Sequence, residues 1–516
     1  MDAIQLSVFS SRIAAICDEM GAMLRSAALS PNIKDRLDFS CAVFDAEGQL
    51  CAQAAHIPVH LGSMAYAMAG IVGQLEWRHG DMVIVNDPFL GGTHLPDVTL
   101  IAPVFVDEQL LAFVCNRAHH ADIGASTPGS MPISKCLEEE GLIIPPSYLI
   151  RMGAVDEAFL DSIVSATGNA QQSRGDFSAQ ISANRAGVQR LTALIDGLGL
   201  GLFRQSLVLL NDYAERLSAT ALQQIPDGEY RFSDVMDDDG MGNRDILIQA
   251  SVKVCDGFVR VDFDGTAEQV QGNINCPLSV AAAAVYYVFR CLMPVQTPAC
   301  AGSFRRIQLC APLGCLVNAK RPAAVAAGNV ETSTRIVDVI MGALAEAIPA
   351  QIPAASHGSM NNVAMGARGE AGQNWDYYET LGGGMGAGAS HAGLSALQTH
   401  MTNTLNTPVE SLEMHYPLRI LRYQVRRGSG GQGKHVGGDG LIREYEFLAP
   451  TTVTLLTERR QHSPWGLNGG QPGLVGENGL DGDALPAKIS FTAKTGQRLL
   501  VSTPGAGGWG LSDSSE

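Results

Sequence analysis

The sequence lacks several features that would each point to a particular class of protein. Its 11 cysteines are scattered through 516 residues, and none sits in a Cys-x-x-Cys motif. We therefore expect reduced thiols rather than a disulfide framework or a zinc finger. Basic residues are also scarce, with 35 Lys and Arg against 52 Asp and Glu, which gives a net charge of −17. Such a charge disfavours nucleic acids and anionic membranes as partners.

Long apolar runs and a basic leader are missing as well. The chain begins Met-Asp, and its longest apolar stretch at helical spacing, residues 280–293, contains Arg290 and is too short to span a bilayer. We therefore predict a cytoplasmic protein without a membrane span. Hydrophobic residues still make up 46% of the chain, which is enough for large buried cores.

Familiar catalytic and nucleotide-binding motifs are absent. The sequence has no Gly-x-Ser-x-Gly and no His-Glu-x-x-His. Residues 428–434 satisfy Gly-x4-Gly-Lys, but His435 stands where a phosphate loop has Ser or Thr to hold magnesium, and no apolar helix follows. Residues 381–390 (LGGGMGAGAS) lack a surrounding βαβ unit. Glycine-rich turns explain both segments better, so we expect no ATP site in this chain.

Residues 86–122 hold the strongest candidate site. A Gly-rich turn delivers His94 and Asp97, and the apolar runs 98–106 and 110–115 that follow are typical of two adjacent strands of a hairpin. If these strands pair, the turn before the first and the loop after the second can lie at one end of the sheet. Imidazoles and carboxylates that converge from two loops form a mixed nitrogen and oxygen site for a divalent metal.

The choice among the remaining histidines stays open at this point. His119 and His120 follow the second run and point to opposite faces of a regular strand, so at most one of them is a ligand there. His56 and His60 are four residues apart, an interval that suits a metal on a helix, but Pro58 between them disfavours a regular helix. Any one such histidine, taken alone, is more often a hydrogen-bonded structural residue.

The rest of the chain mixes helical and strand patterns. Helical spacing marks residues 4–28, 61–71, 179–195, 202–222, 279–293 and 330–348, and strand patterns mark 229–236, 246–255, 257–263 and 452–456. We predict a multidomain α+β protein. An N-terminal mixed α/β domain (1–225) carries the metal site, a central α+β domain (226–380) follows, and a Gly-rich, β-dominated region with inserted helices (381–516) ends the chain.

Several long segments together carry a family resemblance. They are DFSCAVFDAEGQLCAQAAHIPVHLGSM (38–64), NDPFLGGTHLPD (86–97), NRAHHADIG (116–124), GNVETSTRIVDVIMGAL (328–344), LGGGMGAGASHAGLSALQTHMTNTLNTPVESLEMHYPLR (381–419), GSGGQGKHVGGDG (428–440), ERRQHSPWGLNGGQPG (458–473) and TPGAGGWG (503–510). With these segments the chain resembles the B subunit (HyuB-like) of the hydantoinase/5-oxoprolinase family. That family is related to the carboxylase subunits of acetone and acetophenone carboxylases.

The resemblance implies a partner and a reaction. The partner is a HyuA-like ATPase subunit that uses ATP and Mg to phosphorylate the substrate's carbonyl oxygen, and the two form a hetero-oligomer such as (AB)2. The B subunit then hydrolyses the C–N bond of a small cyclic amide, as in hydantoinase, oxoprolinase and lactamase members. An alternative is a subunit of an ATP-dependent ketone carboxylase, and a third reading is a non-catalytic scaffold for the ATPase.

The resemblance also implies a ligand set. Members hold a divalent metal through a His-x-x-Asp pair and a later His, which here means His94, Asp97 and either His119 or His120. Zinc, manganese or iron fits such a set, and the metal lowers the pKa of bound water. His120 and Asp122 are the predicted catalytic residues, with Asp122 orienting an imidazole or binding the metal itself. We further expect the polar run 398–403 to approach the active site or the partner.

Overall fold

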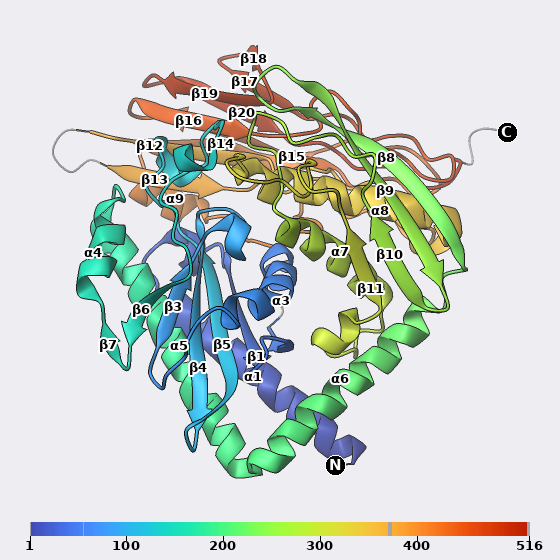
Figure 1. Cartoon of the computed structure of the whole chain (residues 1–516). Coiled ribbons are helices and arrows are strands. Elements are labelled where there is room, and N and C mark those ends of the chain that lie inside the picture. Colours follow the sequence, from blue (N-terminus) through green and yellow to red (C-terminus); the bar gives the residue numbers. More distant parts are fainter. Residues whose placement is uncertain (1, 55, 370–373, 513–516) are drawn as a thin grey trace.

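The N-terminal part of the chain is built on an antiparallel sheet of seven strands. The computed structural model describes residues 2–54, 56–369 and 374–512, and the order in this sheet is β2-β1-β5-β4-β3-β6-β7 (Figure 1). Its strands are β1 (Phe39–Asp45), β2 (Leu50–Gln53), β3 (Met82–Val85), β4 (Asp97–Val106), β5 (Gln109–His119), β6 (Ser147–Arg151) and β7 (Ala154–Val155).

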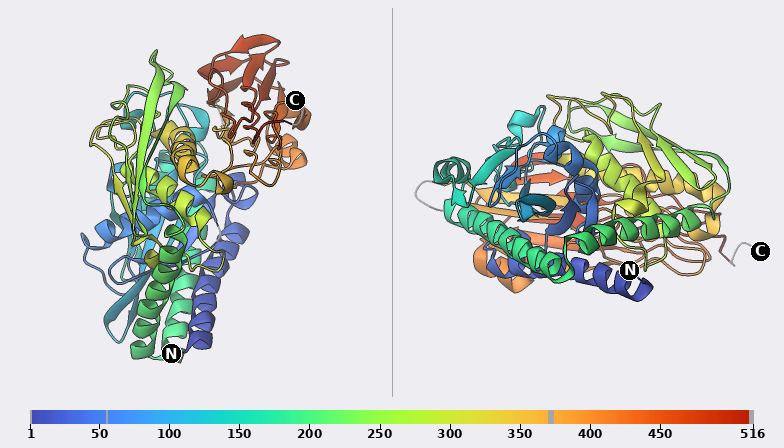
Figure 2. Two further views of the ribbon diagram at one scale, coloured as in Figure 1. Left: turned by 90° about the vertical axis from the view of Figure 1, so that its right-hand side faces the viewer. Right: turned by 60° about the horizontal axis from the view of Figure 1, so that its bottom comes forward.

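Helices cover both faces of this sheet because its strands are apolar on both sides. The helices of this part are α1 (Ala3–Ala27), α2 (Pro31–Lys34), α3 (Pro58–Val72), α4 (Glu157–Ser165), α5 (Ala170–Leu198) and α6 (Leu200–Leu222). Along β5, Val114 belongs to the core beneath the three long helices α1, α5 and α6, whereas Phe113 and Cys115 belong to a second core beneath α3. In Figure 2 the long helices lie side by side at one end of the molecule, and their contacts agree.

The central part packs two helices on a four-stranded sheet. The order is β11-β10-β9-β8, from β8 (Gly228–Asp238), β9 (Arg244–Cys255), β10 (Phe258–Asp262) and β11 (Ile307–Cys310), and only the β10–β11 pair is parallel. Its helices are α7 (Leu278–Leu292) and α8 (Ser333–Ala347). The Ala-rich α7 also packs on α3, where Gly62 faces Ala283 so closely that a Cβ on Gly62 would lie 2.5 Å from the Ala283 Cα. This contact ties the central part to the N-terminal sheet.

The C-terminal part contains two sheets with an apolar core between them, drawn in orange and red in Figure 1. One sheet has the order β13-β12-β16-β19, from β12 (Asn362–Ala367), β13 (Trp375–Glu379), β16 (Thr451–Leu456) and β19 (Lys488–Ala493). The other has the order β14-β15-β20-β17-β18, from β14 (Leu418–Arg426), β15 (Gly440–Phe447), β17 (Glu477–Leu480), β18 (Asp483–Leu485) and β20 (Arg498–Ser502). The short helix α9 (Val409–His415) precedes β14.

The predicted α+β class and the predicted hairpin are confirmed, since β4 and β5 pair antiparallel. Two boundaries differ from expectation. Strand β5 runs on to His119, so this residue belongs to the strand and not to the loop after it. Helix α3 starts at Pro58 and not at residue 61, because proline, which lacks a backbone N–H, is well tolerated at the first helical position. The proposed domain boundaries stay a prediction.

No single helix among the described residues is long and apolar enough to cross a membrane, although α5 and α6, joined by a bend of 105°, meet that test as a pair by length and composition.

Candidate metal centre

The centre is built where the β4–β5 hairpin begins and ends. Asp97, the first residue of β4, lies directly opposite His119, the last residue of β5, and Asp97 Oδ1 is 3.1 Å from His119 Nδ1. His94 comes from the preceding turn and places its Nε2 3.2 Å from the same oxygen. One ligand atom of each residue lies within 4.8 Å of the other two, and all three side chains are buried. We call these three residues the His/Asp cluster.

The two imidazoles are held by contacts that leave one nitrogen atom of each ring without a hydrogen bond. His94 Nδ1 lies 3.2 Å from the carbonyl oxygen of Ala326, and the His119 ring stacks on Tyr378 with centroids 4.7 Å apart. His119 Nε2 is buried and makes no hydrogen bond, and the contact of His94 Nε2 with Asp97 Oδ1 at 3.2 Å lacks hydrogen-bond geometry. Buried nitrogens are rarely left unsatisfied, and two of them beside a carboxylate form the donor set that a divalent metal takes. The residues present therefore fit a metal.

The second oxygen of Asp97 is fixed by other partners. Asp97 Oδ2 accepts hydrogen bonds from Thr93 Oγ1 at 2.6 Å and Asn329 Nδ2 at 3.3 Å, and it lies 3.1 Å from His60 Nε2. Burial opposes ionisation of Asp97, but the imidazoles of His60 and His94 hold its pKa well below its usual range. The carboxylate is thus charged, with Oδ1 turned toward the two candidate imidazole ligands.

A π-helical turn brings Asn329 to the cluster from more than 200 residues away. The turn spans Gly328–Thr332 and leads directly into α8. Gly328 is required there because a Cβ would lie 1.8 Å from the carbonyl oxygen of Asn275. Single π turns of this kind are frequent at functional sites, where they re-aim a side chain.

The cluster faces a small cavity of about 20 Å³. That volume suits about one water molecule. Thr402 lines the cavity, which agrees with the expectation that the run 398–403 approaches the site. The lining also includes Asp38, Ile57, Val59, His60, Asn329, Val330, Met360, Tyr378 and Thr380.

The structure places His120 outside the cluster. Its Nε2 lies 2.9 Å from Gln180 Oε1 on α5, and its ring stacks on Phe177 with centroids 4.3 Å apart. Burial lowers the pKa of His120, so the ring is neutral near pH 7. The alternation of side chains along β5 therefore brings His119, and not His120, to Asp97.

The structure does not bring Asp122 to the cluster either. Its two oxygens accept backbone N–H groups of Gly124 at 2.7 Å and Gly168 at 2.6 Å, and one of them pairs with Arg368 at 3.2 Å. These contacts tie down the loop after β5. His56 is likewise engaged elsewhere, since its Nδ1 accepts the backbone N–H of Cys41 at 3.2 Å.

Three residues at the cluster or its cavity could not be predicted from any pattern in the sequence. Asp38, Asn329 and Tyr378 come from distant segments, and no spacing relates them to His94 or Asp97. His60 did carry a signal through its interval to His56. Pro58 starts α3 rather than breaking it. His60 therefore lies in the first turn of this helix, where its Nε2 is 3.1 Å from Asp97 Oδ2.

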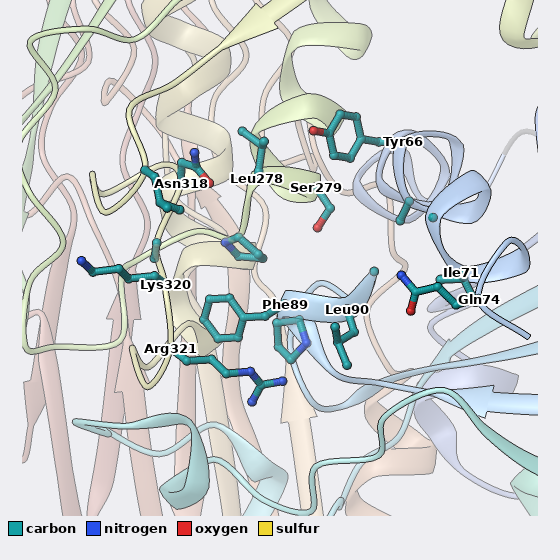
Figure 3. Close-up of a pocket in the computed structure, with 17 residues that line it drawn as sticks. Tyr66, Ile71, Gln74, Phe89, Leu90, Leu278, Ser279, Asn318, Lys320 and Arg321 are labelled. Carbon is teal, nitrogen blue, oxygen red and sulfur yellow. The ribbon is translucent and has the colours of Figure 1, made fainter.

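A much larger cavity lies elsewhere. It has a volume of about 580 Å³ and is bounded by α3, the turn Pro88–Leu90, the start of α7 and residues 318–321 (Figure 3). None of the cluster residues lines it. Its Arg321 stacks over Phe89, 5.2 Å from the ring centroid, and pairs with Asp87. The volume of a cavity therefore does not identify the candidate metal site, because the imidazole nitrogens that lack hydrogen bonds lie at the smaller cavity.

The whole described chain matches one family model. Residues 2–512 match Hydantoinase B/oxoprolinase. The chain belongs to this enzyme family. Among its relatives, 5-oxoprolinase 1 of Arabidopsis thaliana is 38% identical over 99% of the chain, which covers 42% of that protein. The B subunit of a putative D-/L-hydantoinase from a Pseudomonas species is 33% identical, with 99% and 90% of the two chains covered. The chain thus spans less than half of the plant relative.

Two solved structures share the fold. The ATP-dependent caprolactamase from Pseudomonas jessenii has a TM-score of 0.91 at 27% identity, covering 99% of this chain and 91% of that chain. Nucleotide-free acetone carboxylase has a TM-score of 0.88 at 17% identity, covering 99% and 76%. The second likeness shows the fold alone. The expected resemblance to the hydantoinase/oxoprolinase family is therefore confirmed.

Proposed function

We propose that this chain is the hydrolytic B subunit of an ATP-dependent cyclic-amide hydrolase. A partner A subunit phosphorylates the ring carbonyl oxygen, and water activated at the His/Asp cluster then opens the ring. The observation that carries the proposal is the cluster of His94, Asp97 and His119, which faces a cavity the size of one water molecule in a chain of this family.

The roles of the residues follow from their contacts. His94, Asp97 and His119 would hold a divalent ion such as zinc, manganese or iron, and the chemistry that this ion supplies is a lowered pKa of bound water. Asp97 contributes the negative charge and keeps its Oδ1 toward the two imidazoles. Asp38, whose Oδ1 lies 3.9 Å from His60 Nε2, is the nearest further carboxylate on the cavity wall and would accept a proton there.

Phosphorylation explains why so simple a site suffices. An amide resists attack because its nitrogen lone pair is delocalised onto the carbonyl oxygen. A phosphoryl group on that oxygen removes the delocalisation, so that water can add to the ring carbon. The C–N bond then breaks as the ring nitrogen takes a proton, and a second water releases phosphate from the acyl phosphate that remains. The chain then needs only to orient water and hold a proton, which a buried carboxylate with fixed imidazoles can do.

The division between two subunits has support in the lengths of the relatives. The chain covers 90% of the Pseudomonas hydantoinase B subunit but only 42% of the plant 5-oxoprolinase, whose remaining length would correspond to the A part. We infer a HyuA-like ATPase as partner, ATP and Mg used by that partner, and a hetero-oligomer such as (AB)2. The free state of all 11 cysteines supports a cytoplasmic location.

Co-expression with a HyuA-like ATPase subunit tests this proposal. The purified complex should open one of a set of hydantoins, 5-oxoproline and lactams with stoichiometric ATP consumption, whereas this chain alone should consume no ATP. ATP hydrolysis by the isolated chain would contradict the two-subunit scheme. A metal-free complex with full turnover would contradict the role of the cluster.

A ketone carboxylase subunit is the second candidate. Acetone carboxylase has the same fold at 17% identity, so the fold by itself does not separate the two reactions. The same complex would then consume ATP with a ketone and bicarbonate and form a carbon–carbon bond. A complex that orders its ATPase but works equally well with all cluster residues replaced would instead indicate a scaffold.

A further inference from the structure

A second cavity lies on the far side of the first turn of α3 from the His/Asp cluster. It has a volume of about 150 Å³ and lies between α3 and α7. Its walls are mostly apolar and include Pro58, Leu61, Ala283, Tyr286 and Phe304. Tyr286 and Phe304 stack with centroids 4.4 Å apart, which makes one wall rigid.

The cavity contains one cation that lacks a counter-ion. Arg290 of α7 is half-buried and lines the cavity. Its Nη2 donates to the carbonyl oxygen of Thr297 at 2.6 Å, whereas its Nη1 is shielded from solvent and has no hydrogen-bond partner. No carboxylate of residues 2–54, 56–369 or 374–512 forms an ion pair with it. Burial lowers the pKa of Arg290, in the direction expected for a guanidinium that has lost water without gaining a carboxylate.

The thiols that raise the pKa of Arg290 cannot neutralise it. They belong to Cys291 and Cys300, and burial raises the pKa of both, so both are uncharged near pH 7. The hydroxyl of Tyr287, which also lines the cavity, is uncharged as well because burial raises its pKa. A partly desolvated guanidinium without a counter-ion is costly. Proteins retain such a group where an external anion completes it, and the planar guanidinium matches a carboxylate.

A second polar group and the volume of the cavity further limit the ligands that fit. Gln53, at the end of β2, lines the same cavity, and its buried Oε1 accepts no hydrogen bond. This oxygen would take an N–H or O–H donor. A volume of 150 Å³ corresponds to about five water molecules, which limits the ligand to a small molecule.

We propose that the cavity between α3 and α7 binds a small carboxylic acid with an apolar body, its carboxylate on Arg290. The two cavities share one turn of helix, since Pro58 and Leu61 line this cavity while Val59 and His60 line the cavity of the cluster. Hydrolysis of an amide releases a carboxylate, so the product class falls within what this site accepts; this last step rests on the proposed function.

Ligand-observed NMR titration of the metal-free full chain tests the proposal without using turnover. The probes are isobutyrate and isobutyramide, which have the same shape and differ in charge. Isobutyrate should bind at least tenfold more tightly than isobutyramide. Arg290→Gln should remove that preference, and Arg290→Lys should keep it at reduced affinity because the charge remains.

Arg321→Gln is the matched control, since Arg321 is paired with Asp87 and lines the larger cavity. It should leave isobutyrate binding unchanged. Equal binding of the two probes to the unmodified chain, no binding of isobutyrate, or undiminished preference in Arg290→Gln would each overturn the proposal. Because His94→Ala should bind isobutyrate normally, failure of the metal site and failure of this site are separable.

Discussion

Asp97 and His119 occupy directly opposed positions of the β4–β5 ladder, and their side chains meet at 3.1 Å. The pairing register of the hairpin therefore sets the geometry of the candidate metal site. A shift of the register by one residue would turn His119 to the opposite face and present His120 to Asp97. The apolar alternation along both strands, which separates two cores, fixes that register.

His94→Ala should abolish metal binding while the chain stays folded. The variant removes one of three ligands and leaves the hairpin pairing intact, so metal occupancy after dialysis should fall at least tenfold. Elemental analysis measures occupancy, and circular dichroism checks folding. His120→Gln is the control, because His120 bonds to Gln180 and should leave occupancy unchanged. Stoichiometric metal in His94→Ala would refute the ligand assignment.

Tyr378 should position His119 through its ring more than through its hydroxyl. The ring stacks on His119 with an angle of 13° between planes, and the hydroxyl donates to Asn362 Oδ1 at 2.6 Å. Tyr378→Leu should therefore weaken metal affinity by about tenfold, the low end for residues that orient a ligand. Tyr378→Phe keeps the ring and should retain most of the affinity. Competition with a fluorescent chelator measures both, and equal losses would contradict the stacking role.

The same residues show how much of the site can be predicted from the sequence. Two strands and their pairing follow from alternating apolar residues, and His94 and Asp97 follow from residue type and spacing. The choice of His119 needed the observed extent of β5, since the pattern places its end at residue 115. Asn329 and Tyr378 reach the site through packing between segments more than 200 residues apart in the chain, a relationship that no local pattern encodes.

Glu331 should make the folded state less stable as the pH rises. Burial raises its pKa from 4.5 to about 8, so between these values the folded chain holds a proton that the unfolded chain has lost. Stability should thus fall by roughly 2–4 kcal/mol from pH 4.5 to pH 8 through this group. Glu331→Gln keeps an oxygen that can accept from Met360 N and Asn362 Nδ2, and should remove this part of the pH dependence.

Glu346→Gln on the same helix α8 is the control for Glu331, because Glu346 is exposed. Urea unfolding at pH 5 and pH 8 measures both variants against the unmodified chain. An unchanged difference between the two pH values in Glu331→Gln would show that Glu331 is not the group responsible.

The crossing of α3 and α7 should tolerate no side chain at Gly62. A Cβ there would lie 2.5 Å from the Ala283 Cα and 2.8 Å from its Cβ, so Gly62→Ala must push the two helices apart. The expected loss is roughly 1–3 kcal/mol, as for other overpacked contacts. Gly70→Ala is the same change on the same helix, but nothing lies within 4 Å of that Cβ. Alanine favours a helix over glycine, so this control should gain up to about 1 kcal/mol.

Chemical denaturation of both variants measures the difference, and metal occupancy gives a second readout. Since α3 carries His60 and Val59 on the wall of the cluster cavity, a displaced α3 should also weaken metal retention in Gly62→Ala and leave it unchanged in Gly70→Ala. Equal stability of the two variants would mean that the helices separate freely at this crossing. The wall of the cavity would then be loose enough to admit a ring amide without help from a partner.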